Sequence, residues 1–468
     1  MTALVDWIRA LPQRYGRRTL IALGAIALLG LFVRAYVVVD PVEHPGDDSR
    51  AYYALSKALY EEQSFGGPEF EDSSDWSPGA PFLYAAAFYA TGGAREGTAR
   101  IVEALLGVAT ILVVFALGWR LGGRAHGRWV GLFGAFAVAV YPPFLHTTGI
   151  VMSEPPAMLT LPAAVLAFLW ASERQANAVV PGMREQLRSV WPWLVPGLLF
   201  GLTAMFRPEY LFVGAAFVIL AGLRAGLGRG WRPGVTGAAV LLIALILPIL
   251  PWTIRNLVVL DKVVPVSTGG GKALYVGTYL PADGEYQRVK ADLVERYLGR
   301  ELEPGSPALD AVDPTPLFDR VAEEEHPDLP RDEALGKVGK ENFEKCLEED
   351  PGGYLAMTVR KVGRMWSSGV GEAMSSTPGR VVQVLLVLLG LAGFVLLGLR
   401  RRWWELVALA TPIVLVTAIG ALSLAAPRRN EVLMTLVFPL AGLALSSGLA
   451  AISSRREWSP EQASSPPN

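Results

Sequence analysis

The sequence contains a single cysteine, Cys346, among its 468 residues. One cysteine excludes a disulfide within the chain and the paired-cysteine motifs of zinc and redox sites. Charged residues make up only 18% of the chain, whereas a soluble domain usually carries about a quarter. The net charge is −1, so the sequence lacks the basic surplus of nucleic-acid-binding proteins, and no nucleic acid is predicted as a partner.

Histidine is also rare. The chain has four, and only His44 and His146 fall near the segments that carry the other polar candidates discussed below. A lone histidine at a helix end is more often structural than a metal ligand. We therefore predict no tight metal site and no certain cofactor, with a divalent metal ion left open as an alternative.

Apolar residues are abundant, at 52% of the chain. A helix that crosses a bilayer needs roughly 20 largely apolar residues, and fewer where a bundle shields a break. The apolar runs predict an all-α polytopic membrane protein with about ten transmembrane helices. We expect these spans at residues 19–39, 99–117, 129–145, 155–171, 190–206, 210–226, 234–254, 381–399, 403–424 and 432–451.

The arginines predict how the chain is oriented. Arg9, Arg14, Arg17 and Arg18 precede the first span, and basic residues mark the cytoplasmic side of a membrane protein. No small-residue cleavage site follows a short apolar core, so we expect the first span to be an anchor that is retained. Both termini are then predicted to be cytoplasmic in a multi-pass protein of the plasma membrane.

These spans divide the chain into four predicted parts. Residues 1–254 form an N-terminal transmembrane module, whose first outer loop, 40–98, carries interfacial helices. Residues 255–378 form a small extracytoplasmic subdomain that is α-rich or α+β, residues 379–451 supply the last spans, and 452–468 are expected to be disordered. The glycine-rich stretch 267–286 favours a loop or hairpin over a helix. Its GGGK run lacks the spacing of a phosphate-binding loop.

Residues 44–60, HPGDDSRAYYALSKALY, carry two adjacent carboxylates, Asp47 and Asp48. Tyr52, Leu55 and Ala58 follow at helical spacing, which predicts a short amphipathic helix against the membrane surface. The carboxylates stand where N-cap and first-turn residues belong, so one interpretation is that they only cap this helix. The alternative is that they line a site beside the membrane.

Further polar residues fall at the predicted outer ends of the spans. Charged groups at membrane depth are costly and usually face a cavity or a partner. Each arginine alone could reach the lipid headgroups or close a helix-end ion pair. Together, arginines beside carboxylates suit a site that holds a lipid-linked phosphate, because a guanidinium binds phosphate through two parallel hydrogen bonds. The residues of this set are Arg34, Glu154, Arg207, Glu209, Arg255, Arg428 and Arg429.

Several segments, in order, resemble the GT-C superfamily of membrane glycosyltransferases, in particular bacterial relatives of the dolichyl-phosphate-mannose–protein mannosyltransferases and of the lipid A aminoarabinose transferases. GDDSRAYYALSKAL is similar to the first-loop motif of that family, with Asp48 and Tyr52 in register. The other segments are SPGAPFLYAAAFYATGG, AVYPPFLHTTGIVMSEPPAM, GLLFGLTAMFRPEYL, LPWTIRNLVVLDKVVPVSTGGG and EKCLEEDPGGYLAMTVRKVGRMW.

The resemblance implies a mechanism. The donor would be a polyprenyl-phosphate-linked sugar, and the first-loop aspartate, Asp48, would be the general base, with Asp47 as substitute or support. Glu154 would be a second carboxylate. Tyr52 and the arginines, Arg207, Arg255, Arg428 and Arg429, would bind substrate. The configuration at the anomeric carbon would be inverted.

We therefore predict a membrane glycosyltransferase that moves a sugar to a hydroxyl of an envelope glycan, lipid or protein at the outer face. Two alternatives belong to other classes. A secondary transporter would move solute without consuming a lipid-linked sugar. A non-catalytic scaffold for envelope assembly would tolerate substitution of Asp48.

Overall fold

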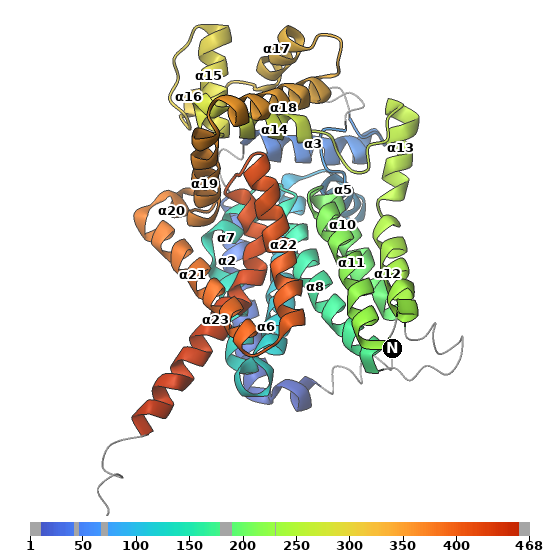
Figure 1. Ribbon diagram of the computed structural model, residues 1–468, viewed down its shortest axis with the longest axis vertical. Coiled ribbons are helices and arrows are strands. Elements are labelled where there is room, and N and C mark those ends of the chain that lie inside the picture. The colour runs from blue at the N-terminus through green and yellow to red at the C-terminus, as the bar shows by residue number, and fades with distance from the viewer. Residues whose placement is uncertain (1–10, 42–45, 67–73, 178–189, 230, 458–468) are drawn as a thin grey trace, which may run out of the picture.

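The computed structural model describes residues 11–41, 46–66, 74–177, 190–229 and 231–457. Within these ranges the chain forms helices and turns, and no strand is present (Figure 1). Long helices form a bundle, and a group of shorter helices, α14 to α19, stacks at the end of the bundle where α3 also lies. We call this group the cap subdomain.

Among the described residues, six helices are long and apolar enough to cross a membrane. A bent pair, α12 (Trp231–Ile246) and α13 (Leu250–Leu260), would be a seventh span with a 49° bend. The chain is thus an all-α, multi-pass membrane protein, as predicted, whereas the count of about ten spans stays a prediction. The six helices are α2 (Arg17–Val39), α6 (Glu96–Val140), α8 (Glu154–Asn177), α21 (Thr377–Leu399), α22 (Trp403–Leu422) and α23 (Arg428–Glu457).

Helix α6 covers two of the predicted spans because the chain reverses direction within it. Gly123 has φ +61° and ψ −156°, a conformation that is essentially confined to glycine. The two arms then pack closely: a Cβ at Gly118 would lie 2.8 Å from Val130 O, and one at Gly131 would lie 2.9 Å from Phe115 O. Small residues at these crossings let the backbones of the arms approach each other.

The first outer loop contains α3 (Gly46–Glu61) and α5 (Gly79–Thr91). Tyr52, Leu55 and Ala58 of α3 are buried, which confirms the amphipathic spacing read from the sequence. α5 starts against the end of α10 (Leu194–Phe206), since a Cβ at Gly79 would lie 2.8 Å from Met205 O. These contacts seat the predicted catalytic loop on the bundle.

The cap subdomain has a small apolar core of its own, which includes Leu293, Phe318 and Leu335. Its helices are α14 (Gly270–Thr278), α15 (Tyr286–Leu298), α16 (Pro307–Asp310), α17 (Thr315–Glu325), α18 (Arg331–Glu349) and α19 (Pro351–Ser367). The remaining elements are α7 (Pro142–Thr148), η1 (Trp191–Trp193), α11 (Tyr210–Arg229), η2 (Leu280–Ala282) and α20 (Glu372–Ser375).

The prediction of a loop or hairpin over 267–286 is wrong for residues 270–278, which form α14. Glycine is unfavourable inside a helix, but close packing repays that penalty here. Gly269 enters the helix with φ +94°, and Cβ atoms at Gly271 and Gly277 would overlap the backbones of Asp332 and Ser423. The glycines therefore let α14 lie directly against α18 and the end of α22.

The predicted domain limits remain predictions. α13 runs across position 254, and α23 runs across position 451 and continues to Glu457. Residues 452–457 of the expected disordered tail are thus helical, and residues 458–468 lie outside the described part.

Candidate active site

Asp48 lies in the first turn of α3 and faces the start of α23. Its Oδ2 accepts a hydrogen bond from Nη1 of Arg428, and the two side chains form an ion pair although they are 380 positions apart in the sequence. Both remain accessible, with 32% of the Asp48 side chain and 38% of the Arg428 side chain exposed. The side chain of Asp47 lies outside the described residues.

The surrounding cations determine the charge state of Asp48. Burial acts to raise its pKa, but Arg428, followed by Lys272 and Arg207, outweighs burial and holds the pKa of the carboxyl below its usual value. Asp48 is therefore a carboxylate at neutral pH. A carboxylate can accept a proton, but the neighbouring guanidinium makes it a weaker base than a free aspartate.

A second ion-pair group centres on Arg207, between α10 and α11. Its Nη1 donates to Glu154 Oε1 at 2.6 Å, and its Nη2 donates to Glu209 Oε1 at 2.9 Å. Pro208 pushes Arg207 into an extended conformation, which ends α10 and turns the guanidinium toward α8. Glu154 is fully buried at the start of α8, so Arg207 neutralises a carboxylate that has no access to water.

Tyr52 connects the Asp48 and Arg207 groups. Burial, reinforced by Glu154, raises the pKa of its phenol to about 12, while a hydrogen bond with Ser153 opposes this. One turn earlier, Ser49 Oγ accepts a hydrogen bond from Val151 N at 3.0 Å, which fixes α3 beside the start of α8. The structure thus brings the first-loop motif and the Ser-Glu pair together, which fits the prediction that the polar residues at the outer ends of the spans share one site.

Two buried groups beside these pairs are incompletely satisfied. Nη1 of Arg429 has no hydrogen-bond partner in the described part of the chain, although its charge acts on Glu209. Both carboxyl oxygens of Glu431, in the same first turn of α23, are likewise without a partner among the described residues. Unsatisfied buried polar groups are rare in folded proteins and often mark functional positions. We call Asp48, Tyr52, Glu154, Arg207, Glu209, Arg428, Arg429 and Glu431 the α3-end cluster.

Arg255 is engaged elsewhere in its described contacts. Its Nη2 donates to Phe65 O at 3.2 Å, and its guanidinium stacks on Trp252 at 4.9 Å from the ring centroid. These contacts tie α13 to the first outer loop. The role of Arg255 in binding phosphate stays a prediction.

The sequence argument missed two residues in this region: Lys272 and Glu431. Glu431 follows the predicted arginine candidate Arg429 by two residues, and that adjacency is a signal that could have found it. Lys272 belongs to the GGGK run, whose spacing does not fit a phosphate-binding loop. Burial lowers the pKa of its ammonium and Asp48 opposes this, so the lysine lies close enough to interact with the predicted base.

No group of three or more potential metal-ligating side chains occurs in the described residues. His146 packs against Gly371, and His44 lies outside the described part. The absence of a tight metal stays a prediction.

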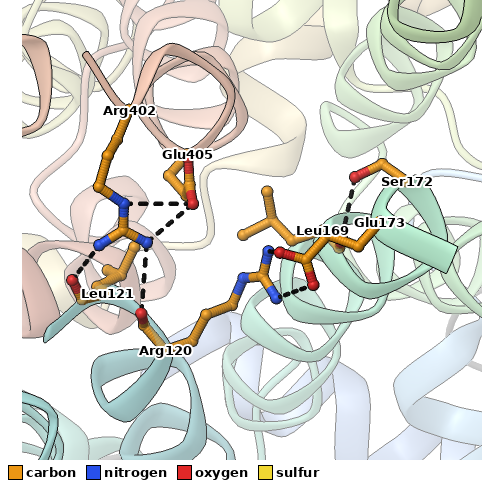
Figure 2. Close-up of polar contacts among 7 residues, drawn as sticks. All are labelled: Arg120, Leu121, Leu169, Ser172, Glu173, Arg402 and Glu405. Atoms are coloured by element: carbon orange, nitrogen blue, oxygen red, sulfur yellow. Dashed lines mark hydrogen bonds and ion pairs between the residues drawn. The ribbon is translucent and has the colours of Figure 1, made fainter. Parts of the chain in front are cut away.

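A contrasting set of ion pairs lies at the other end of the bundle (Figure 2). Arg120 pairs with Glu173 through two hydrogen bonds of 2.9 and 2.7 Å. Arg402 pairs with Glu405 and also donates to the carbonyls of Leu121 and Arg120, where the first arm of α6 ends. Arg402 precedes α22 and Arg428 follows it, so this far-end cluster is separated from Asp48 by the length of a helix of 20 residues, about 30 Å.

The arrangement resembles that of known membrane glycosyltransferases. The structure of the oligosaccharyltransferase AglB from Archaeoglobus fulgidus, in complex with an inhibitory peptide and a dolichol-phosphate, matches with a TM-score of 0.54 and 17% identity. The match covers 98% of this chain and 53% of that one. The apo form matches with a TM-score of 0.56 and 16% identity, over 94% and 51%.

The chain has a GT-C fold. The predicted family resemblance is thus confirmed at the level of the fold, and the chain spans about half the length of the AglB structures. ArnT from Cupriavidus metallidurans bound to undecaprenyl phosphate matches at 15% identity over 94% of this chain and 81% of that one, but its TM-score of 0.38 is too low to establish likeness. No protein-family model matches the chain, and no curated protein matches it in sequence.

Proposed function

We propose that the protein is a membrane glycosyltransferase that transfers a sugar from a polyprenyl-phosphate donor to an acceptor hydroxyl of an envelope glycan, lipid or protein. The observation that carries the proposal is the ion pair between Asp48 of α3 and Arg428 of α23, which joins a carboxylate to a guanidinium, the group best suited to bind a phosphate. The support from relatives is that the AglB structure of the same fold holds a dolichol-phosphate.

The proposed reaction is a single displacement. The acceptor oxygen forms a bond to the anomeric carbon, the bond from that carbon to the phosphate oxygen breaks, and the configuration inverts. The hydroxyl proton passes to the carboxylate of Asp48, because a hydroxyl is a poor nucleophile until a positioned base accepts its proton. The leaving group is the lipid phosphate, whose growing negative charge fixed cations stabilise.

Arg428 reconciles the low pKa of Asp48 with its role as a base. Without substrate, its guanidinium pairs with the carboxylate and weakens it as a base. A bound phosphate would compete for the same guanidinium and draw it away from Asp48. Donor binding would then raise the basicity of Asp48.

The other residues of the α3-end cluster have supporting roles in this proposal. Arg207 holds the buried carboxylates of Glu154 and Glu209, so it positions the start of α8 beneath Tyr52. Arg429 carries an unsatisfied buried N–H that could donate to a phosphate oxygen. We place the site at the extracytoplasmic face and both termini in the cytoplasm, on the arginine distribution of the sequence.

The test compares wild type with Asp48→Asn in nanodiscs, with a panel of radiolabelled polyprenyl-phosphate sugars and envelope extract as acceptor. We expect Asp48→Asn to slow transfer by roughly 100- to 10,000-fold, the usual contribution of a general base. Glu61→Gln is the matched control, because Glu61 lies on the same helix and only pairs with Lys57 at the surface. Equal transfer by wild type and Asp48→Asn would refute the assignment of the base.

The same assay separates the two alternatives. A secondary transporter would carry a solute across proteoliposomes and leave the lipid-linked sugar intact. A scaffold would support envelope assembly in cells that carry Asp48→Asn. Consumption of a donor that depends on Asp48 excludes both.

A further inference from the structure

Lys272 stands in the first turn of α14, a helix that is fixed tightly to its neighbours. Cβ atoms at Gly271 and Gly277 would overlap the backbones of α18 and of Ser423. The fully buried Lys361 of α19 adds a clamp: its Nζ donates to Gly277 O at 2.7 Å and to Ser423 O at 3.1 Å. Both ends of α14 are therefore held, and the position of Lys272 relative to the bundle is set by backbone contacts.

The ammonium of Lys272 is held over aromatic rings without a carboxylate partner. Its Nζ lies 4.6 Å from the ring centroid of Phe318 and 5.3 Å from that of Tyr286. No ion pair of Lys272 is found among the described residues, whereas the other basic side chain nearby in the cap subdomain, Arg331, pairs with Asp75 and Asp319. A half-buried lysine with two cation–π contacts and no counterion retains a charge that is free to meet an anion.

Two of the neighbouring cations are already committed to carboxylates. Arg428 pairs with Asp48, and Arg207 pairs with Glu154 and Glu209. Lys272 lies near enough to Asp48 and Arg428 for their charges to act on its ammonium. An anion that drew Arg428 away from Asp48 would therefore sit within the influence of a second, unpaired cation from the cap subdomain.

We propose that Lys272 binds a phosphate oxygen of the lipid-linked donor, so that the cap subdomain completes a phosphate site begun by Arg428. This inference deepens the proposed function and rests on it. An ammonium suits this position because it is a compact charge with three donors, which can follow the phosphate as the bond to the sugar breaks.

The experiment measures binding rather than transfer. Wild type, Lys272→Met and Lys272→Arg are placed in nanodiscs of phosphatidylcholine, and binding of polyprenyl phosphate without sugar is titrated by native mass spectrometry. We expect Lys272→Met to weaken binding by roughly 10- to 100-fold, the effect of losing one hydrogen bond to a charged group. Lys272→Arg should retain most of the affinity, and binding of uncharged polyprenol should be the same in all variants.

Lys262→Met is the matched control, because Lys262 is an exposed lysine of the same region that pairs with Glu333 at 2.6 Å. Equal affinity of wild type and Lys272→Met for polyprenyl phosphate would overturn the proposal. Equal loss for polyprenol would overturn it too, since that would show a damaged lipid groove. Melting temperatures show whether each variant is folded. If Lys272→Met is unfolded, the affinity of Lys272→Arg for polyprenyl phosphate is the deciding measurement.

Nanodiscs that contain phosphatidylglycerol distinguish the source of the phosphate. If this lipid competes with polyprenyl phosphate at equal concentration, Lys272 binds bulk headgroups and the proposal fails. The outcome for transfer is separate: phosphate binding that depends on Lys272 in a protein that transfers no sugar would refute the proposed function and leave the phosphate site standing.

Discussion

The two ends of the bundle use the same residue types for different purposes. At the far end, Arg402 pairs with Glu405 and donates hydrogen bonds to the carbonyls at the end of the first arm of α6. At the α3 end, Nη1 of Arg429 and both carboxyl oxygens of Glu431 are buried without a partner in the described structure, whereas the far-end cluster has one such atom, Nε of Arg120. A carboxyl with no partner on either oxygen is not needed to join helices, so the difference supports the proposal of a substrate site at the α3 end.

Burial also differs between two of the ion pairs, one from each end. The Arg207–Glu154 pair is 11% and 0% exposed, whereas the Arg120–Glu173 pair is 19% and 53% exposed. Removing one partner of a buried pair leaves a charge in the interior without a counterion, whereas the remaining partner of an exposed pair is hydrated. Variants of these two pairs should therefore change the stability on different scales.

The largest expected effect on stability is that of Arg207→Met. It would leave the carboxylates of Glu154 and Glu209 without their cation, which we expect to destabilise the fold by about 3 to 5 kcal/mol. Thermal unfolding in detergent, followed by tryptophan fluorescence, measures this. Adding Glu154→Gln and Glu209→Gln to Arg207→Met should recover part of the loss. If Arg207→Met melts like wild type, the α3 end is no more dependent on its charges than the far end.

A moderate effect is expected for Arg402→Met at the far end. The change removes the pair with Glu405 and exposes the α6 carbonyls of Leu121 and Arg120, at a cost of about 1 to 2 kcal/mol. Transfer per folded molecule should be unchanged, because the site lies at the other end of α22. Arg400→Met, which loses only a contact with Ser447, serves as the control. Impaired transfer by folded Arg402→Met would contradict the expectation that only the α3 end takes part in the reaction.

Glu431→Gln should change stability little, within about 1 kcal/mol, and in the direction of greater stability. An isolated carboxyl in the interior is unfavourable, and the amide has the same shape without the acid. The comparison of melting temperatures should be made together with transfer rates. Lower stability of Glu431→Gln would show that this carboxyl has a partner in the native state.

The smallest effect is expected for Glu173→Gln, whose loss of the exposed pair with Arg120 should cost about 0.2 to 1 kcal/mol. The difference from wild type should shrink further as salt is added, since screening weakens exposed pairs. Melting curves at low and high salt measure both. A loss as large as that of Arg207→Met would mean that the far end is also a buried, charge-dependent site.

Much of the membrane architecture was predictable because long apolar runs have few alternatives to a spanning helix. The spacing of Tyr52, Leu55 and Ala58 predicted α3, since burial of one face fixes a helical period. The polar residues at the ends of the spans were also grouped correctly in part, because topology places Asp48, Glu154, Arg207 and Arg428 at one depth.

The failures have physical causes. Local glycine content argued against α14, but its helix is stabilised by contacts with α18 and Ser423 that lie far away in the sequence. The role of Arg255 in binding phosphate stays a prediction, but depth alone did not indicate its contact with Phe65, because topology gives the height of a residue and not its direction around the bundle. Lys272 was missed because it belongs to the subdomain that follows the seventh predicted span, and the sequence does not show how that subdomain lies relative to the spans.

The clamp of Lys361 bears on how a long lipid could enter the site. Moving α14 away would break the two hydrogen bonds of Lys361 to Gly277 and Ser423. It would also separate the backbones of Gly277 and Ser423, which lie too close for a side chain between them. The cap subdomain is thus fixed to the end of α22 by these contacts. We therefore expect the donor to enter by movement between other helices, with this contact kept closed.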